Sequence, residues 1–312
     1  MGARSETLTN EEMMNQADMM AKIERGDGFI AALDQSGGST PKALKGYGYN
    51  GDEWSNDEEM FGLIHDMRSR IISSPSFGSG KVLGAILFER TMDGTVDGKP
   101  VPEVLIEKGV VPFIKIDKGL EEEANGVQMM KPMPTLIDLL TKAKGLGVFG
   151  TKERSVINLA NPDGITAVVK QQFDIARQVL SQGLVPIIEP EVNIKSPERD
   201  AADRLLLDAI LLELESIPNG QRVMLKLSIP VKANLFQPLV EHPKVLRVVA
   251  LSGGFSRAEA CTELSKNPGM IASFSRALLS DLRHGMSDEE FDRALGTAID
   301  EIYEASTEKV PA

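Results

Sequence analysis

Val223-Met224-Leu225-Lys226-Leu227-Ser228 is a short apolar run with one lysine inside it, and Pro230 follows shortly after its end. A run of this kind, rich in Val, Leu and Met and bounded by turn residues, is typical of a buried strand in a parallel sheet. Lysine is almost never fully buried unless it is paired or functional. Lys226 is therefore either a side chain that extends its amine to solvent at a strand end or a functional amine inside the fold. The rest of the sequence decides between the two.

Apolar runs of the same kind recur along the chain and alternate with amphipathic helical stretches. The predicted strands are 29–33, 82–87, 111–116, 147–150, 185–188, 223–227, 245–251 and 270–274. The predicted helices are 57–72, 134–144, 163–181, 197–215, 256–265 and 287–308, with a further one that begins near Thr9. This alternation in a chain of 312 residues favours an α/β fold, a single-domain (β/α)8 TIM barrel with an extra N-terminal helix. We expect a flexible N-terminal tail over 1–8 and the barrel over 9–312, with a surface hairpin within 93–102.

Composition excludes several classes of function. The chain is 42% hydrophobic and 26% charged, which is ordinary for a globular protein, and its net charge of −12 argues against nucleic-acid binding and against an anionic membrane surface. Cys261 is the only cysteine, so no intrachain disulfide forms and a reducing compartment is expected. The sequence contains no apolar stretch of transmembrane length and no signal peptide, so we expect a cytoplasmic protein. A homo-oligomer is possible, but no part of the sequence indicates one.

Polar or charged residues close nearly every predicted strand. They are Asp34, Glu89, Lys115 with Asp117 and Lys118, Lys152 with Arg154, Glu189 with Glu191, Lys226, Ser252, and Ser273 with Arg276. One such residue is usually a solvated strand terminus, but the C-terminal ends of barrel strands all meet at one mouth, where catalytic groups lie. The set therefore predicts a charged site. Its lysines, arginines and carboxylates indicate an anionic substrate and acid–base chemistry.

The last two strands carry a possible phosphate site. Ser252-Gly253-Gly254 ends one strand and is expected to start a helix, whose backbone N–H groups would bind an anion. Alone, such a tripeptide is most often a plain turn. Ser273 and Arg276 follow the next strand, and the loops after strands 7 and 8 are the usual phosphate site of a barrel.

Glu189-Pro190-Glu191 places two carboxylates beside a rigid proline. One of them would serve as general acid–base while the other sets its charge or binds a neighbouring lysine; the alternative is a pair of solvated acids. An ordinary lysine offers only about 0.04% free amine at pH 7. Burial beside another cation, such as Lys152, favours the neutral amine, which would attack a ketone to form a Schiff base.

Two other signals carry no function. Gly145 to Gly150 fits a dinucleotide-binding glycine pattern, but it follows a helix and enters a strand, which is the wrong order. The histidines are scattered, which argues against a zinc site. We therefore expect neither a metal nor a cofactor.

Taken together, the motifs resemble those of class I fructose-bisphosphate aldolase, in its shorter bacterial branch. The resemblance runs from Gly28 to about Tyr303, and its carriers are Ala-Leu-Asp34-Gln-Ser-Gly-Gly-Ser-Thr-Pro, Ile-Leu-Phe-Glu89, Ile-Lys115-Ile-Asp-Lys-Gly, Gly-Thr-Lys152-Glu-Arg154, Ile-Glu189-Pro-Glu191, Met-Leu-Lys226-Leu, Leu-Ser252-Gly-Gly and Ser273-Phe-Ser-Arg276. The family is a (β/α)8 barrel that reversibly cleaves fructose 1,6-bisphosphate into dihydroxyacetone phosphate and glyceraldehyde 3-phosphate, in glycolysis and gluconeogenesis. The resemblance thus implies small sugar phosphates as partners and no metal.

The resemblance also implies a role for each site residue. Lys226 would form the Schiff base, Glu189 would be the general acid–base with Glu191 shaping its charge, Lys152 would assist and help to keep Lys226 neutral, and Asp34 would handle the C4 hydroxyl. Two sets would hold the substrate: Ser252, Gly253, Gly254, Ser273 and Arg276 at the C1 phosphate, and Ser36, Ser39, Lys115 and Arg154 toward the other phosphate and the sugar hydroxyls.

The chain departs from the animal and plant branch at a few positions. Leu227 replaces a proline, Glu153 replaces a tryptophan, and no tyrosine lies in the C-terminal tail, since the nearest is Tyr303. An alternative substrate is another phosphorylated ketose, sedoheptulose 1,7-bisphosphate or fructose 1-phosphate. More distant alternatives are a metal-dependent barrel that uses Glu189, Glu191 and Asp34 as ligands, and a non-catalytic binding protein.

Overall fold

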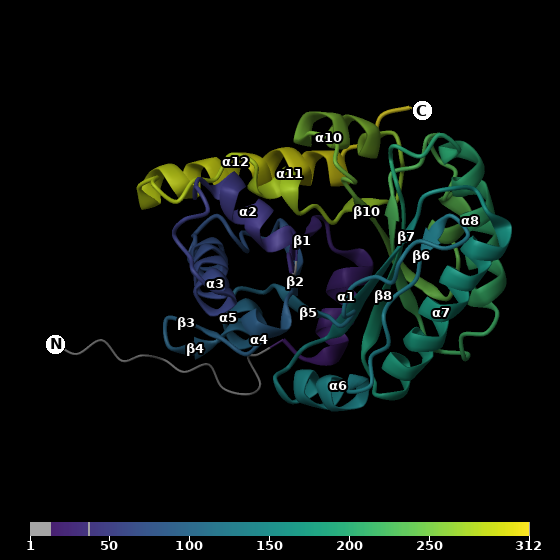
Figure 1. Cartoon of the computed structure of the whole chain (residues 1–312), viewed down its shortest axis with the longest axis horizontal. Coiled ribbons are helices and arrows are strands. Elements are labelled where there is room, and N and C mark those ends of the chain that lie inside the picture. Colours follow the sequence, from purple (N-terminus) through teal and green to yellow (C-terminus); the bar gives the residue numbers. More distant parts are fainter. Residues whose placement is uncertain (1–13, 37, 312) are drawn as a thin grey trace.

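The computed structural model describes residues 14–36 and 38–311, and these form a barrel of parallel strands enclosed by helices (Figure 1). The barrel strands are β1 (Phe29–Leu33), β2 (Val82–Leu87), β5 (Val111–Lys115), β7 (Gly150–Ile157), β8 (Val185–Val192), β9 (Val223–Ser228), β10 (Val245–Leu251) and β11 (Ile271–Ala272). They pair in chain order from β1 to β11. A backbone hydrogen bond of 3.1 Å from Ala32 to the carbonyl of Phe274 links the first strand to the segment after the last. The (β/α)8 prediction is confirmed.

Apolar side chains fill the interior of the barrel. Phe113 of β5 and Phe149 meet edge to face, with their ring centroids 5.5 Å apart. The strands beside β5 carry glycines at this level because a side chain there would collide with Phe113. A Cβ at Gly84 would lie 3.0 Å from the Phe113 ring, and one at Gly150 would lie 2.9 Å from it. The interior is therefore closed to water below the level at which polar side chains begin.

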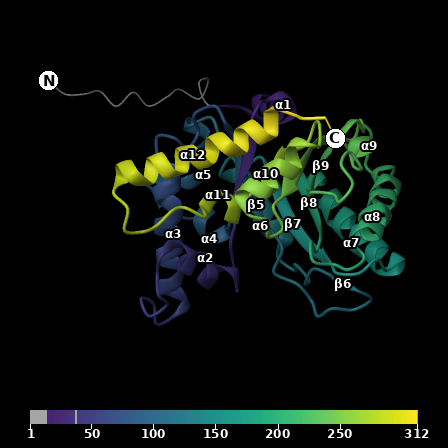
Figure 2. The ribbon, with the colours of Figure 1, turned by 90° about the horizontal axis from the view of Figure 1, so that it is seen from above.

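Helix α1 (Gln16–Arg25) closes the N-terminal end of the barrel. Asn15 caps it by accepting hydrogen bonds from the first turn, and its apolar residues Met19 and Ile23 are buried in the same cluster as the interior side chains. Arg247 of β10 donates to the carbonyls of Glu24 and Gly26 at the other end of the helix, at 2.7 and 2.9 Å. Figure 2 shows α1 at the end opposite the segment that carries β6. The other end of the barrel is left as the mouth.

The remaining helices cover the outside of the barrel through a second apolar layer. They are α2 (Ser39–Tyr47), α3 (Asp57–Ser73), α4 (Glu89–Met92), α5 (Val101–Glu107), α6 (Leu136–Gly145), α7 (Pro162–Ser181), α8 (Arg199–Leu214), α9 (Gln237–Val240), α10 (Arg257–Ser265), α11 (Arg276–Leu279) and α12 (Asp288–Thr307). Within the described part of the chain, none of the helices has the length and apolarity needed to cross a bilayer.

Several predicted boundaries were wrong. The strand predicted at 147–150 runs instead from Gly150 to Ile157, and the one predicted at 185–188 continues to Val192. Both strands extend beyond the apolar core into the mouth, where their polar side chains face the cavity and interrupt the apolar pattern. Helices α2 and α5 were not predicted, because glycine and proline in and around them are typical of turns.

Other expectations were confirmed or fall outside the described residues. The hairpin predicted within 93–102 is formed by β3 (Thr95–Val96) and β4 (Lys99–Pro100), which pair antiparallel. The short strand β6 (Val127–Gln128), which was not predicted, pairs with the end of β7. The tail predicted over 1–8 and the helix start predicted near Thr9 lie outside the described residues; α1 begins at Gln16.

Candidate active site

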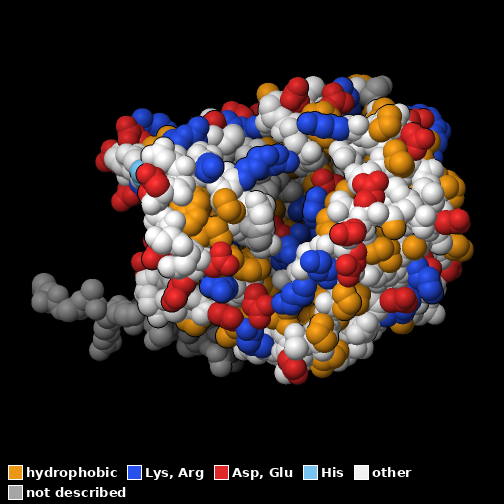
Figure 3. Space-filling view, in the orientation of Figure 1, with side chains coloured by type: hydrophobic (Ala, Val, Ile, Leu, Met, Phe, Trp, Pro, Cys, Tyr) orange, Lys and Arg blue, Asp and Glu red, His pale blue; other side chains and the backbone are white. Residues whose placement is uncertain are grey.

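A cavity of about 760 Å³ opens at the C-terminal ends of the barrel strands. Figure 3 shows it as a hollow with Lys and Arg side chains gathered on its walls. Of the predicted site residues, the cavity wall contains Asp34, Ser36, Ser39, Lys115, Lys152, Arg154, Glu189, Glu191, Lys226, Ser252, Gly253, Ser273 and Arg276. Gly254 lies just beside the wall, since a Cβ there would be 3.5 Å from Nη2 of Arg276. Residues scattered over most of the sequence thus meet in one place.

A continuous chain of ion pairs crosses the floor of the cavity. Lys152 Nζ lies 2.6 Å from Asp34 Oδ2 and 3.0 Å from Glu189 Oε2. The other oxygen of Glu189, Oε1, lies 3.2 Å from Lys226 Nζ. All four side chains are buried; Lys226 is only 4% exposed and Lys152 only 3%. Glu189 therefore bridges two amines in a site that excludes most water.

Strand register explains this convergence. On neighbouring strands, Ile187 of β8 pairs with Met224 of β9, and both belong to the apolar interior. Two residues further along each strand lie Glu189 and Lys226, on the same face because side chains alternate along a strand. The polar layer therefore rests directly on an apolar one, which keeps water away from it from below.

Opposite charges stabilise the ionised forms of Lys152 and Asp34. Burial by itself lowers the pKa of Lys152, but the carboxylates of Asp34 and Glu189 outweigh it and hold that pKa above its ordinary value. Burial likewise raises the pKa of Asp34, but Lys152 and Lys226 outweigh it and hold that pKa below its usual range. Lys152 is therefore a permanent cation at neutral pH, placed between two carboxylates.

The other charged residues of the wall are also paired. Arg154 Nε lies 2.5 Å from Glu191 Oε2, so the partner of Glu191 is an arginine, whereas Glu189 is the carboxylate that contacts lysines. Lys115 Nζ lies 2.6 Å from Asp117 Oδ1 and 2.9 Å from the carbonyl of Asp117. Asp117, which was predicted among the strand-end residues but given no role, is thus a wall residue that binds Lys115.

The last two strands bring together the predicted phosphate residues. Gly253 and Gly254 have φ values of 58° and 117°, a region that favours glycine. The prediction that Ser252-Gly253-Gly254 starts a helix was wrong, because α10 begins at Arg257 with Ser256 as its cap. The Ser273 hydroxyl lines the cavity, yet its oxygen is buried and has no partner among the described residues. A buried hydroxyl without a partner at a cavity wall is a donor available to a ligand.

Gln35, Lys42 and Ser275 are among the cavity residues that were missed, because they lie on loop or helix segments with no strand signal. Gln35 lies between two predicted site residues, Ser275 lies beside Arg276, and Lys42 is exposed on α2. Lys42 makes no ion pair with any described residue. The unpredicted helix α2 is what turns Lys42 toward the mouth.

Glu153 lies on the same strand as Lys152 and Arg154 but points to the opposite face, as strand alternation requires. It is fully buried, and neither carboxylate oxygen has a partner among the described residues. Burial, with the negative charges of Asp117 and Glu189, raises the pKa of Glu153 well above its usual range despite the opposing effect of Lys152. Glu153 therefore keeps its proton to a higher pH than an ordinary glutamate does.

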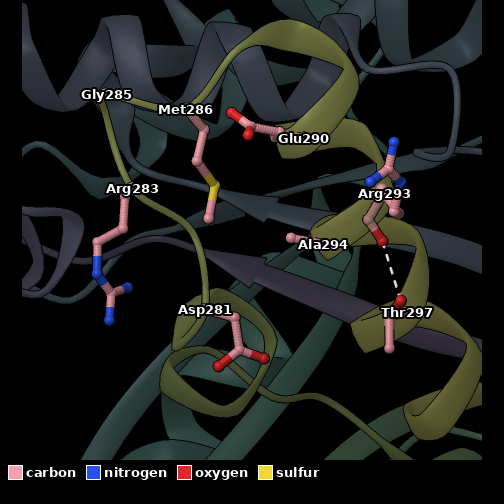
Figure 4. Close-up of a pocket in the computed structure, with 8 residues that line it drawn as sticks. All are labelled: Asp281, Arg283, Gly285, Met286, Glu290, Arg293, Ala294 and Thr297. Atoms are coloured by element: carbon pink, nitrogen blue, oxygen red, sulfur yellow. Dashed lines mark hydrogen bonds between the residues drawn. The ribbon is translucent and has the colours of Figure 1, made fainter.

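A second hollow lies on the surface beside the first turns of α12 (Figure 4). It has a volume of about 490 Å³ and is lined by Asp281, Arg283, Gly285, Met286, Glu290, Arg293, Ala294 and Thr297. Its wall contains neither a buried lysine nor a buried carboxylate. The barrel mouth is therefore the candidate active site.

Comparison with known proteins places this geometry in a family. The family model described as fructose-bisphosphate aldolase class-I matches residues 12–199. Among solved structures, fructose-bisphosphate aldolase from Plasmodium falciparum, in complex with TRAP and a small-molecule inhibitor, is 20% identical, and the match covers 98% of each chain with a TM-score of 0.77. An archaeal fructose-1,6-bisphosphate aldolase, whose catalytic lysine is bound to the carbinolamine intermediate of its substrate, is 11% identical over 93% of this chain and 100% of the other, with a TM-score of 0.50.

The two structural matches show a shared fold, while the family model spans more than half of the sequence. The chain accordingly belongs to the class-I fructose-bisphosphate aldolases, lyases that work through a Schiff base and need no metal.

Proposed function

We propose that the protein reversibly cleaves fructose 1,6-bisphosphate into dihydroxyacetone phosphate and glyceraldehyde 3-phosphate, as a step of glycolysis and gluconeogenesis, and that Lys226 forms the Schiff base. The observation that carries this proposal is the amine of Lys226, which is buried in the cavity wall and lies 3.2 Å from Glu189 Oε1. A buried lysine within reach of a general acid–base has the arrangement that imine formation requires.

The reaction begins at the C2 carbonyl of the ketose. Glu189 accepts a proton from Lys226, and the neutral amine then attacks C2 to form a carbinolamine. Glu189 returns a proton to the departing hydroxyl, which leaves as water, and the protonated imine remains. Lys152, held between Asp34 and Glu189, supplies positive charge near the oxygen that carries the developing charge.

Asp34 is placed to cleave the carbon–carbon bond. Its ionised carboxylate accepts the proton of the C4 hydroxyl, the C3–C4 bond breaks, and the electron pair moves to the protonated imine. The aldehyde leaves as glyceraldehyde 3-phosphate. Protonation of the resulting enamine at C3, followed by hydrolysis of the imine, releases dihydroxyacetone phosphate and restores Lys226.

Both ends of the cavity offer donors for phosphate. The proposed C1-phosphate residues are Ser252, Gly253, Ser273 and Arg276, with Gly254 beside Arg276. The proposed residues for the other phosphate and the sugar hydroxyls are Ser36, Ser39, Lys115 and Arg154, to which we add Lys42. Glu191 holds Arg154 in place, and Asp117 holds Lys115.

Borohydride reduction in the presence of dihydroxyacetone phosphate, followed by peptide mass mapping, tests the mechanism. The adduct is expected on the peptide that contains Lys226. The Lys226→Met variant is expected to form no adduct and to lose cleavage activity, whereas Lys170→Met, which changes an exposed lysine of α7, keeps both. An adduct on another lysine, or an active Lys226→Met variant, contradicts the proposal.

A comparison of substrates tests the choice of ketose. Cleavage of fructose 1,6-bisphosphate is expected to exceed that of fructose 1-phosphate in kcat/KM. Because Lys42 is exposed, its loss in Lys42→Met is expected to raise KM for the bisphosphate by about two- to fivefold and to leave KM for the monophosphate unchanged. A higher kcat/KM for sedoheptulose 1,7-bisphosphate or for fructose 1-phosphate would favour that ketose instead.

A further inference from the structure

Arg68 of α3 is a fully buried cation beneath the loop that follows β1. Nη2 donates to the backbone carbonyl of Gln35 at 2.5 Å and to the Gln35 side-chain oxygen at 3.2 Å. Nη1 donates to Thr91 Oγ1 at 2.8 Å. No carboxylate among the described residues forms an ion pair with it. Neutral oxygens therefore solvate this buried charge, and Gln35 provides two of them.

Arg68 remains charged at neutral pH. Burial lowers its pKa to about 10, and the Asp34 carboxylate opposes that shift. An arginine has only donors, so the oxygen of the Gln35 amide must face Arg68. The NH2 group of the same amide must then face the other way.

On that other side lies Ser275, in the segment after β11. Nε2 of Gln35 donates to Ser275 Oγ at 2.6 Å. The serine oxygen is thus an acceptor in this bond, and its own hydrogen is left to donate elsewhere. No described residue accepts it. Ser275 lines the cavity between Ser273 and Arg276, so the free hydrogen is available to a ligand at the phosphate end.

The three residues form a chain in which every hydrogen bond runs in the same direction, away from the buried charge. Hydrogen bonds aligned in this way polarise one another, and the effect is strongest where water is excluded. We propose that Arg68, through Gln35, orients the Ser275 hydroxyl as an additional donor to a phosphate group of the substrate, with Arg68 and Gln35 as positioning residues. The proposal deepens the function proposed above and rests on it for the identity of the sugar phosphate.

The chain also ties two parts of the site together. Gln35 lies between Asp34 and Ser36, in the loop after β1, while Ser275 lies in the loop after β11. The first and last strands of a barrel meet only where it closes, and here β11 is short. The bond from Gln35 to Ser275 therefore adds a link across the closure, at the level of the substrate.

Phosphate binding provides the test. A hydrogen bond to a charged group contributes enough that Ser275→Ala is expected to raise the Kd for inorganic phosphate, measured by calorimetry, about tenfold or more. KM for fructose 1,6-bisphosphate is expected to rise in parallel, with kcat nearly unchanged. Ser265→Ala, which removes a hydroxyl bonded within α10, serves as the control and is expected to change none of these values.

Gln35→Glu tests the direction of the chain without the risk of unfolding that an Arg68 substitution carries. A carboxylate only accepts hydrogen bonds, so it would pair with Arg68 and turn the Ser275 hydroxyl away from the cavity. We expect Gln35→Glu to weaken phosphate binding strongly in the parent protein and much less in the Ser275→Ala background. The thermal midpoint is expected not to fall.

Two outcomes overturn the proposal: an unchanged Kd in Ser275→Ala, or an equal effect of Gln35→Glu in both backgrounds, which would show simple charge repulsion. These outcomes are separate from failure of the proposed function. A protein that forms no borohydride adduct but loses phosphate affinity in Ser275→Ala would refute the aldolase assignment and keep the phosphate donor.

Discussion

Replacing Glu153 by glutamine is expected to stabilise the protein, and increasingly so as the pH rises. Glutamine has nearly the same shape, so the substitution creates no cavity. It removes the need to keep a proton on a fully buried carboxyl group whose oxygens have no partner among the described residues. The unfolded chain has no such need, because its glutamate is ionised above about pH 4.3.

The sign and the magnitude follow from proton linkage. Since the pKa of Glu153 is raised in the folded state, the folded protein retains a proton that the unfolded chain releases. Wild-type stability is therefore fully present below the unfolded pKa and is lost as the pH rises toward the folded pKa, by up to about 1.4 kcal/mol per pH unit. From about pH 5 to about pH 7, the difference in unfolding free energy between Glu153→Gln and wild type should grow for as long as the folded carboxyl group keeps its proton, and by at most about 2.7 kcal/mol.

Urea unfolding at a series of pH values measures this difference, and the single tryptophan, Trp54, is a natural fluorescence probe. Glu122→Gln, at an exposed glutamate, is the matched control and should give a difference that does not depend on pH. If the curves of Glu153→Gln and wild type run parallel across this range, Glu153 is ionised in the folded protein and the reasoning is refuted.

Two further predictions concern other buried groups. Arg199 pairs with the buried Asp203 at 3.1 Å, so Arg199→Met leaves an unpaired buried carboxyl group and should lower the unfolding free energy measured in urea by about 3–5 kcal/mol. Adding Asp203→Asn should recover part of this loss. An unchanged urea midpoint in Arg199→Met would contradict the pairing. Burial and the nearby Glu301 raise the pKa of Cys261 to about 11. Alkylation of this thiol by iodoacetamide near pH 8 should therefore be slow in the native protein and fast after unfolding. Equal rates would show an accessible thiolate and contradict the prediction.

The predictable part of the site is the part that follows from strand ends. Lys226 and Glu189 could be assigned to one mouth because parallel barrel strands all point their C-terminal ends the same way. Lys42 and Ser275 could not, because one lies on a helix and the other in a loop that carry no apolar period. Glu191 was predicted in the site and lies in the cavity wall. Its pairing with Arg154 could not be predicted, because it depends on which side chains face each other across β7 and β8.

The sequence by itself determined the class of fold and the residues that close its strands, because apolar runs and their polar ends are local properties of the chain. For β7 and β8 it determined only the part that lies in the apolar core. Both strands continue into the mouth, where their side chains are polar. Only the tertiary structure decided which partner each charged group has. Glu189 bridges Lys152 and Lys226, Asp117 binds Lys115, and Arg68 acts through Gln35. Distances between residues far apart in the chain set the strength of an electrostatic interaction, and only closure of the barrel fixes those distances.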